Sequence, residues 1–333
     1  NKENSEVIDY LNEENKYFDA KLKHTEQLQN DLYEEIVGRL DKEESSVPYL
    51  LDGYLYSQRY EKGKEYPVFG RRKQSEHNAD EEILIDQNKL AKNHSFCAIG
   101  KLSVCSNNTI LAYSVDFVSR RMYDIYFKNL QTGELLKDKI PNTSGGFAWA
   151  NDGKTLFYTQ KDEKTLRSNK VYKHILGTDS KNDELIFIEE DETFICNVYR
   201  SKSKKYIIIG SYSTLSTEFR IVSSDQPNDE FKIFEQRQKN HEYSIEHKGD
   251  EFFIITNKDG CKNFKLMRCQ IDFTTSTNWE QILPNREDVL LEDIEVFDKF
   301  IVLNERKNGL TQFRVLNLNE NSEYLIDLEE ESY

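Results

Sequence analysis

The sequence predicts an all-β protein, a β-propeller with four-stranded blades, preceded by an N-terminal α-helical segment. Two observations lead to this prediction. Residues 1–47 place apolar side chains at helical intervals and contain no Gly or Pro before Gly38. From residue 48 onward, short segments rich in Tyr, Phe, Ile and Val alternate with Asn-Asp-Gly, Asn-Lys-Asp-Gly and Lys-Asn-Gly turns, a pattern typical of strands and hairpins. We therefore divide the chain into a helical segment, 1–47, and a propeller domain, 48–333.

Composition and charge narrow the possible partners. The 333-residue chain has a formal net charge of -15 and 37% hydrophobic residues, and its length suits one large all-β domain or two mid-sized domains. Nucleic acid is disfavoured because Lys and Arg supply most of the affinity for phosphates, whereas a cationic ligand is favoured. No apolar run approaches the roughly 20 residues that cross a bilayer, so we expect no membrane partner. The five cysteines are odd in number and widely spread, which favours a reducing cytoplasm.

The helical segment carries a narrow apolar stripe and reads as one long helix or two shorter ones. Ser5 is a candidate cap of the first turn, and Thr25 a candidate start of a second helix. Isolated helices are marginal in water, so the stripe needs a surface to cover it. That surface belongs either to the chain's own propeller or to a partner. The stripe consists of Val7, Leu11, Phe18, Leu22, Leu28, Leu32, Ile36 and Leu40.

The propeller prediction depends on a repeat. Apolar segments that read as second strands begin at Leu111, Leu156, Ile207, Phe252 and Phe300, 45 to 51 residues apart. Four-stranded units with this period are typical of β-propellers, in which each blade buries an apolar face against the next. Either six blades close a ring, or the chain stops short of a seventh. The six units are 49–86, 99–136, 147–189, 194–235, 243–283 and 291–326.

A short phrase of aromatic, basic and aliphatic residues marks the third strand of three units. We expect its aromatic residue to fill the gap between neighbouring blades. The basic residue that follows points to the opposite face of the strand, where we expect it to be solvated. The aromatic residues are Phe219, Phe264 and Phe313, and the basic residues are Arg220, Lys265 and Arg314.

Known catalytic motifs are absent from the sequence. It has no nucleophile elbow, no His-Glu-x-x-His, no P-loop and no dinucleotide-binding glycine pattern, so we assign no catalytic residue, no cofactor and no metal. His241 and His247 lie six residues apart on a predicted strand, and a metal enzyme using them is a further alternative.

Two charged loops are the candidate binding residues. Arg120 and Arg121 lie between the second and third strands of one unit, and Glu189, Glu190, Asp191 and Glu192 link two units. Both loop types fall on one face of a propeller. They could form a docking or gating surface or hold a charged peptide. The alternative is that they are solvated loop charges with little energetic effect.

Several long phrases resemble the oligopeptidase B (protease II) branch of the prolyl oligopeptidase family of serine peptidases. The resemblance extends over essentially the whole chain. Members combine N-terminal helices, a seven-bladed propeller and a C-terminal α/β-hydrolase domain with a Ser-Asp-His triad. This sequence departs from that pattern because the family's first residues, seventh blade and hydrolase domain are missing from it. The matching phrases include "ENKYFDAKLKHTEQLQNDLYEEIVGRL", "SSVPYLLDGYLYSQRYEKGKEYPVFGRRK", "LAYSVDFVSRRMYDIYFKNLQTGELL", "EEDETF" and "HEYSIEHKGDEFFIITN".

The resemblance implies a function for the chain. It implies the gating and substrate-selecting propeller of a cytoplasmic serine oligopeptidase that cleaves short peptides after Arg or Lys. The implied partners are short basic peptides and the hydrolase domain of the parent enzyme, on which the N-terminal helices of the family pack. The chain alone is then expected to be inactive. The alternative is a stand-alone propeller interaction module without enzymatic activity.

Overall fold

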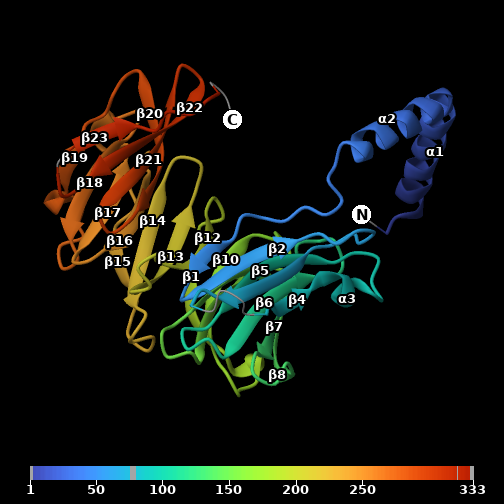
Figure 1. Cartoon of the computed structure of the whole chain (residues 1–333), viewed down its shortest axis with the longest axis horizontal. Coiled ribbons are helices and arrows are strands. Elements are labelled where there is room, and N and C mark those ends of the chain that lie inside the picture. Colours follow the sequence, from blue (N-terminus) through green and yellow to red (C-terminus); the bar gives the residue numbers. More distant parts are fainter. Residues whose placement is uncertain (1–2, 76–79, 321, 331–333) are drawn as a thin grey trace. The chain divides into compact units, whose positions relative to one another are not determined.

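The computed structural model describes residues 3–75, 80–320 and 322–330. The chain divides into two compact units, Asn1–Lys89 and Leu90–Tyr333. We call them unit 1 and unit 2 and describe each by itself. Figure 1 colours them from blue to red along the chain.

Unit 1 begins with two helices joined by a single 3-10 turn, η1 (Lys23–Thr25). They are α1 (Ser5–Leu22) and α2 (Glu26–Gly38), so the two-helix alternative is correct. The predicted cap is wrong by one residue, because Asn4 rather than Ser5 accepts a hydrogen bond from the backbone N–H of Glu6, at 2.9 Å. No residue of either helix is buried. Within the described part of the chain, no helix combines the length and the apolar character needed to cross a membrane.

The rest of unit 1 is a four-stranded antiparallel sheet, which corresponds to the first four-stranded repeat predicted from the sequence, 49–86. Its strands pair in chain order, and the short helix α3 (Gln87–Ala91) follows the last of them. Tyr56 is buried in this sheet and stacks on Tyr49 with ring centroids 5.4 Å apart. The strands are β1 (Tyr49–Leu51), β2 (Tyr54–Arg59), β3 (Val68–Lys73) and β4 (Glu82–Asp86).

Unit 2 opens with a seven-stranded antiparallel sheet in the order β11-β10-β9-β8-β7-β6-β5. The sequence predicts two separate four-stranded units here, and this separation is wrong. The first half of β8 pairs with β7 and its last residues pair with β9. One strand therefore belongs to both predicted four-stranded repeats, 99–136 and 147–189. Positive φ angles at Asn142 and Gly145 interrupt the pairing between the two halves. The strands are β5 (Ala98–Val104), β6 (Ile110–Asp116), β7 (Tyr123–Asn129), β8 (Leu135–Trp149), β9 (Thr155–Lys161), β10 (Ser168–Ile175) and β11 (Glu184–Ile188).

Three four-stranded antiparallel sheets follow, each with its strands in chain order, as predicted. The first holds β12 (Ile195–Arg200), β13 (Tyr206–Tyr212), β14 (Thr217–Ser223) and β15 (Lys232–Glu235). The second holds β16 (Tyr243–Lys248), β17 (Glu251–Thr256), β18 (Lys265–Gln270) and β19 (Glu280–Leu283). The third holds β20 (Val289–Val296), β21 (Phe300–Lys307), β22 (Leu310–Asn317) and β23 (Ser322–Leu325). Short 3-10 turns lie at η2 (Ser180–Asn182), η3 (Lys258–Gly260) and η4 (Ser276–Asn278).

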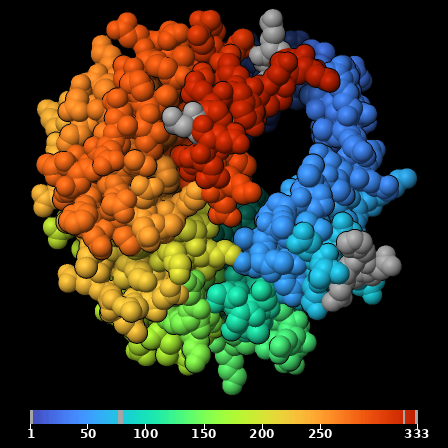
Figure 2. Space-filling view, turned by 60° about the vertical axis from the view of Figure 1, so that its left-hand side comes forward, coloured from blue at the N-terminus to red at the C-terminus, as the bar shows by residue number. Residues whose placement is uncertain are grey.

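Apolar cores lie between successive sheets of unit 2. Phe219 and Phe234 of one sheet pack with Ile245 and Phe252 of the next in one cluster. A second cluster joins Phe253 to Leu303 across the following pair of sheets. Figure 2 shows the surfaces of β12–β23, coloured from yellow-green to red, following one another in contact. Each sheet therefore buries its apolar face against its neighbour, as the blades of a propeller do.

The third-strand aromatic residues are only partly as predicted. Phe219 is buried between two sheets, and Phe313 lies in β22 half-buried. Phe264 packs half-buried against the core between the last two sheets, as predicted. It lies one residue before β18 with φ 61°, however, so it is not an equivalent strand residue. Leu266 takes that position, because Phe219 and Leu266 both precede the register shift opposite the fourth strand.

The prediction that the neighbouring basic residues are solvated is wrong. Arg220 pairs with Glu218 at 2.7 Å and lies over the ring of Phe187, its Cζ 4.3 Å from the centroid. Lys265 is buried, and its Nζ is 2.8 Å from Asp259. Similarly, the Nε of Arg314 lies 3.2 Å from the fully buried carboxylate of Glu305. These three cations are therefore held in ion pairs, and Arg220 also contacts the neighbouring sheet through Phe187.

Candidate functional site

The candidate site lies among loops at one end of the sheets of unit 2. In a four-stranded antiparallel blade, the connection between the second and third strands and the link to the next blade leave from the same end. Contacts join the two loop types here: the N–H of Asn240 donates to the Ser216 hydroxyl, and the N–H of Thr217 donates to the carbonyl of His241. We call this end the loop face. It comprises residues 117–122, 162–167, 189–194, 213–216, 236–242 and 257–264.

The first acidic residue of the predicted loop is buried. Glu189 is 2% exposed, and its carboxylate accepts hydrogen bonds from Arg237 Nη2 at 2.9 Å and from the N–H of Asp191 at 3.1 Å. Glu190 and Glu192 are exposed, as is Asp191. The Thr193 hydroxyl and N–H donate to the Asp191 carboxylate and lower its pKa. The alternative that these residues are solvated loop charges is therefore wrong for Glu189, whose charge is paired inside the fold.

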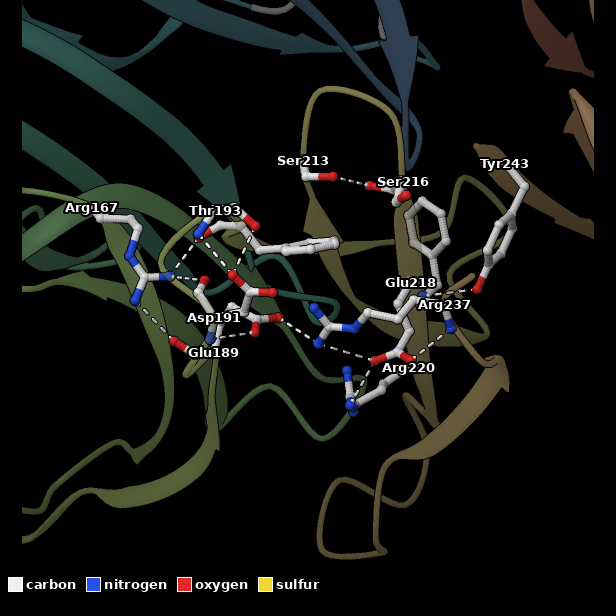
Figure 3. Close-up of polar contacts among 12 residues, drawn as sticks. Arg167, Glu189, Asp191, Thr193, Ser213, Ser216, Glu218, Arg220, Arg237 and Tyr243 are labelled. Atoms are coloured by element: carbon white, nitrogen blue, oxygen red, sulfur yellow. Dashed lines mark hydrogen bonds and ion pairs between the residues drawn. The ribbon is translucent and has the colours of Figure 1, made fainter. Parts of the chain in front are cut away.

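Arg237 is the centre of a buried chain of charges (Figure 3). Its Nη2 reaches Glu189 at 2.9 Å and Glu218 at 3.6 Å, and its N–H donates to the Glu218 carboxylate at 3.0 Å. Glu218 also pairs with Arg220, while the Arg237 guanidinium lies 4.2 Å from the centroid of the Phe194 ring. Buried carboxylates are tolerated when they are paired and hydrogen-bonded in this way. The network therefore fixes the orientation of Arg237.

A second arginine holds the acidic loop by its backbone. Arg167 donates from Nη1 to the carbonyls of Asp191 and Phe194, at 2.7 and 2.5 Å, and from Nη2 to the carbonyl of Glu189, at 3.1 Å. Figure 3 shows this guanidinium facing the turn that carries Asp191 and Thr193. The loop is thus ordered by a neighbouring hairpin, which leaves the side chains of Glu190 and Glu192 exposed.

Arg120 and Arg121 lie on another loop of the same face. Both are exposed, and their backbone N–H groups donate to the buried carboxylate of Asp116 at 2.9 and 2.6 Å. The carbonyl of Arg121 accepts a hydrogen bond from Lys161 Nζ at 2.5 Å. Across the described residues, no hydrogen bond or ion pair joins these two arginines to the acidic loop. Their part in docking or peptide binding stays a prediction.

Sequence reasoning missed the ion pairs of Glu218, Arg220 and Arg237, and it expected Arg220 to be solvated. A signal for the first two was present, because Glu218 and Arg220 flank Phe219 and residues at i and i+2 share one face of a strand. Opposite charges on the face that Phe219 avoids indicate an ion pair along this strand. Arg237 carries no comparable local signal. Its partner Glu189 is 48 residues earlier in the sequence.

The metal alternative fails on geometry. His247 lies near the end of β16 and His241 lies two residues before its start. An extended chain rises about 3.3 Å per residue, so six residues separate them by about 20 Å. Each ring contacts a hydroxyl instead: His241 Nε2 lies 3.0 Å from Thr256 Oγ1, and His247 Nδ1 lies 2.7 Å from Ser203 Oγ. In the ranges that the structure describes, no group of three or more His, Cys, Asp or Glu side chains is placed to hold a metal ion.

Comparison with known proteins places this fold in a family. The model described as "Prolyl oligopeptidase, N-terminal beta-propeller domain" matches residues 1–332. The chain belongs to the prolyl oligopeptidase family. The match confirms both the resemblance read from the sequence and the propeller fold.

Prolyl oligopeptidase family relatives match the chain along most of its length. Dipeptidyl aminopeptidase BI of Pseudoxanthomonas mexicana is 38% identical over 97% of this chain and 47% of its own. Protease 2 of Moraxella lacunata is 32% identical over 95% of this chain and 46% of its own. The solved oligopeptidase B of Leishmania major superposes with a TM-score of 0.91 at 28% identity, covering 98% of this chain and 47% of that one. The chain thus spans about half the length of the relatives it matches.

Proposed function

We propose that this chain is the gating and substrate-selecting propeller portion of a cytoplasmic serine oligopeptidase that cleaves short peptides after Arg or Lys. The observation that carries the proposal is the match of residues 1–332 to the family's propeller model. Likeness to Protease 2 of Moraxella lacunata and to the oligopeptidase B of Leishmania major supports the finer assignment. The reacting groups would come from a partner hydrolase domain.

The acidic character of the chain supports a preference for basic peptides. Its net charge of -15 raises the local concentration of cationic peptides, an effect that fades as salt screens it. On the loop face, Glu190, Asp191 and Glu192 present exposed carboxylates. Arg120 and Arg121 would contact the hydrolase domain or a substrate carboxylate, since guanidinium pairs bidentately with carboxylate.

The N-terminal helices supply a surface for the hydrolase domain. Leu11 and Phe18 of α1 and Leu32 and Ile36 of α2 are all exposed. Burying such residues contributes roughly 1.5 to 3 kcal/mol each. We infer that this stripe docks on the hydrolase domain and helps to hold the two halves together.

Complementation tests the proposed function. The 333-residue chain is assayed with an arginyl amide substrate, alone and after co-expression with the hydrolase half of Protease 2 from Moraxella lacunata. We expect no turnover from the chain alone and turnover from the pair above that of the hydrolase half alone. Turnover by the purified chain itself would contradict the assignment of the chemistry to the partner. No gain from the pair would favour a stand-alone interaction module.

The name of one relative supports a second specificity. Dipeptidyl aminopeptidase BI is 38% identical to this chain, which favours release of dipeptides from a free amino terminus. The complemented enzyme separates the two specificities. A dipeptidyl amide with a free amino group and the same substrate with a blocked amino group are compared; cleavage of the blocked form supports endopeptidase action, and its rejection supports the aminopeptidase.

A further inference from the structure

The loop face of unit 2 contains two adjoining hollows that share Gln238, Lys239 and Asn240. One has a volume of about 410 Å³ and is also lined by Phe194, Thr214 and Arg237. The other has a volume of about 670 Å³ and is also lined by His241, Lys258 and Lys262. We call the two together the Lys239 groove. Its long polar side chains make it unlike the apolar seams between blades.

Arg237 presents a fixed cationic edge to this groove. Nη2 is tied to Glu189 and Glu218, and the guanidinium stacks on Phe194. In the described chain, its Nε and Nη1 have no hydrogen-bond partner, and the side chain is 30% exposed. A guanidinium whose orientation is already set loses little entropy on binding a carboxylate. Because two carboxylates already balance Arg237, it supplies donors rather than net charge.

The net positive charge of the Lys239 groove comes from lysines. Lys239 and Lys262 are exposed and make no ion pair or side-chain hydrogen bond among the described residues. Lys258 Nζ donates to the hydroxyl of Ser276. The acidic residue of the lining, Asp259, is paired with Lys265 at 2.8 Å. The groove is therefore locally cationic in a chain whose formal charge is -15.

His241 lies in the groove without adding charge. It is 5% exposed. Burial, with a further contribution from Lys258, lowers its pKa, so the ring is neutral near pH 7. The cationic character therefore does not depend on histidine protonation, and it holds across the neutral range.

We propose that the Lys239 groove binds a carboxylate group of the peptide substrate. The guanidinium and ammonium groups recognise the charge, while the Thr214 hydroxyl and the Asn240 amide can hydrogen-bond the adjoining peptide backbone. The inference rests on the proposed function and names a feature of its substrate. A C-terminal carboxylate lies within reach of the cleaved bond only when that bond is near the C-terminus of the peptide. The groove therefore selects, by charge, bonds close to a free C-terminus.

Binding to the 333-residue chain tests the proposal without any catalysis. The probes are the peptide Ala-Arg-Ala-Ala as free acid, the same peptide as C-terminal amide, and the amide with Glu in last place. We expect the free acid to bind about tenfold more tightly than the amide, the scale of one charge-assisted hydrogen bond, with the difference shrinking at high salt. Tight binding of the Glu-containing amide would identify any carboxylate as sufficient; binding of the free acid alone would identify the terminus.

A matched pair of variants locates the binding. Lys239→Gln combined with Lys262→Gln should bring the affinity for the acid down to that for the amide. The control combines Lys202→Gln with Lys205→Gln, which removes the same charge from a basic pocket at the other end of the same strands and should leave the preference unchanged. Arg237 is kept, because its loss would leave the buried carboxylate of Glu189 without its ion-pair partner. Circular dichroism confirms that both variants fold.

Three results would overturn the carboxylate site: equal binding of acid and amide, equal loss in the control variant, or no binding of either peptide. None of these depends on turnover. Restored cleavage on complementation would then still support the proposed function. Conversely, an acid preference that Lys239 and Lys262 carry, without restored cleavage, would support a peptide-binding module in place of the peptidase.

Discussion

The helices of unit 1 and the sheets of unit 2 use their apolar residues in opposite ways. Leu11 and Phe18 on α1 are 54% and 60% exposed, whereas Phe219 and Phe252 in the sheets are 1% and 0% exposed. Successive sheets of unit 2 pack against one another, so the apolar residues on their facing sides are covered. The helices carry an equally regular stripe that buries none of its residues.

The difference shows that periodicity predicts an element but does not predict what covers it. A helix gains most of its stability from tertiary packing of its apolar face. An exposed stripe therefore indicates an element whose stability depends on a partner, which agrees with the docking proposed for α1 and α2. Both tryptophans, Trp149 and Trp279, lie in unit 2, so their fluorescence reports unfolding of the sheets alone.

The largest effect is expected for Phe252→Ala. The ring is fully buried in β17 and contacts Phe234 edge-on, with centroids 4.9 Å apart. Removing it leaves a cavity between two blades and should lower the free energy of unfolding by about 3 to 5 kcal/mol. Denaturant titration followed by tryptophan fluorescence measures this loss. A loss below about 1 kcal/mol would show that the seam between these sheets is loosely packed.

Glu246→Gln should reveal a blade residue whose burial is unfavourable. Burial, with added repulsion from Glu295 and Asp293, raises the pKa of Glu246 to about 7 from 4.5. The folded state holds this proton more tightly, so stability falls as pH rises from about 4.5 to 7, by up to about 3 kcal/mol. In a denaturant titration at pH 8, the variant should therefore unfold at a higher denaturant concentration than the natural chain. At pH 4.5 the two midpoints should be the same.

The matched control for this pH effect is Glu190→Gln, which removes the same charge from an exposed position. It should shift unfolding little at either pH. If Glu246→Gln gave no gain at pH 8, or if the control gave the same gain, the stabilisation would come from net charge rather than from burial of this carboxyl.

Tyr243→Phe should have a smaller cost. The buried hydroxyl donates to the carbonyl of Glu235 at 2.6 Å and accepts from the N–H of Phe219 at 3.1 Å. Without it, both backbone groups lose a buried partner, at a cost of about 1 to 3 kcal/mol. The same denaturant titration measures the change. An unchanged midpoint would mean that water replaces the hydroxyl.

The smallest effect on the sheets is expected for Phe18→Ser. The side chain is exposed on α1, so the free energy of unfolding measured by tryptophan fluorescence should change by less than about 0.5 kcal/mol. Complementation with the hydrolase half should weaken, because the proposed docking surface loses an aromatic side chain. A clear shift in the fluorescence midpoint would show that the helix stabilises unit 2. Tyr17→Ser, also on α1 but outside the predicted stripe, is the control for complementation.

Much of the architecture could be read from local patterns. The helical spacing of Val7 to Leu40 predicted α1 and α2, although the cap lies at Asn4. The apolar segments at Ile207 and Phe252 fall within second strands, as predicted. These features depend on residues close in sequence, where backbone geometry and side-chain periodicity act directly.

The sequence by itself determined which segments become helices and strands and the spacing at which apolar second strands recur, because those properties follow from the spacing of apolar residues. Only the tertiary structure decided that β8 pairs in two of the predicted four-stranded repeats, that Leu266 takes the position expected for Phe264, and that Glu189 pairs with Arg237. The burial of a charged side chain depends on a partner supplied by another blade. When neighbouring sheets bring that partner from far along the chain, local sequence carries no record of it.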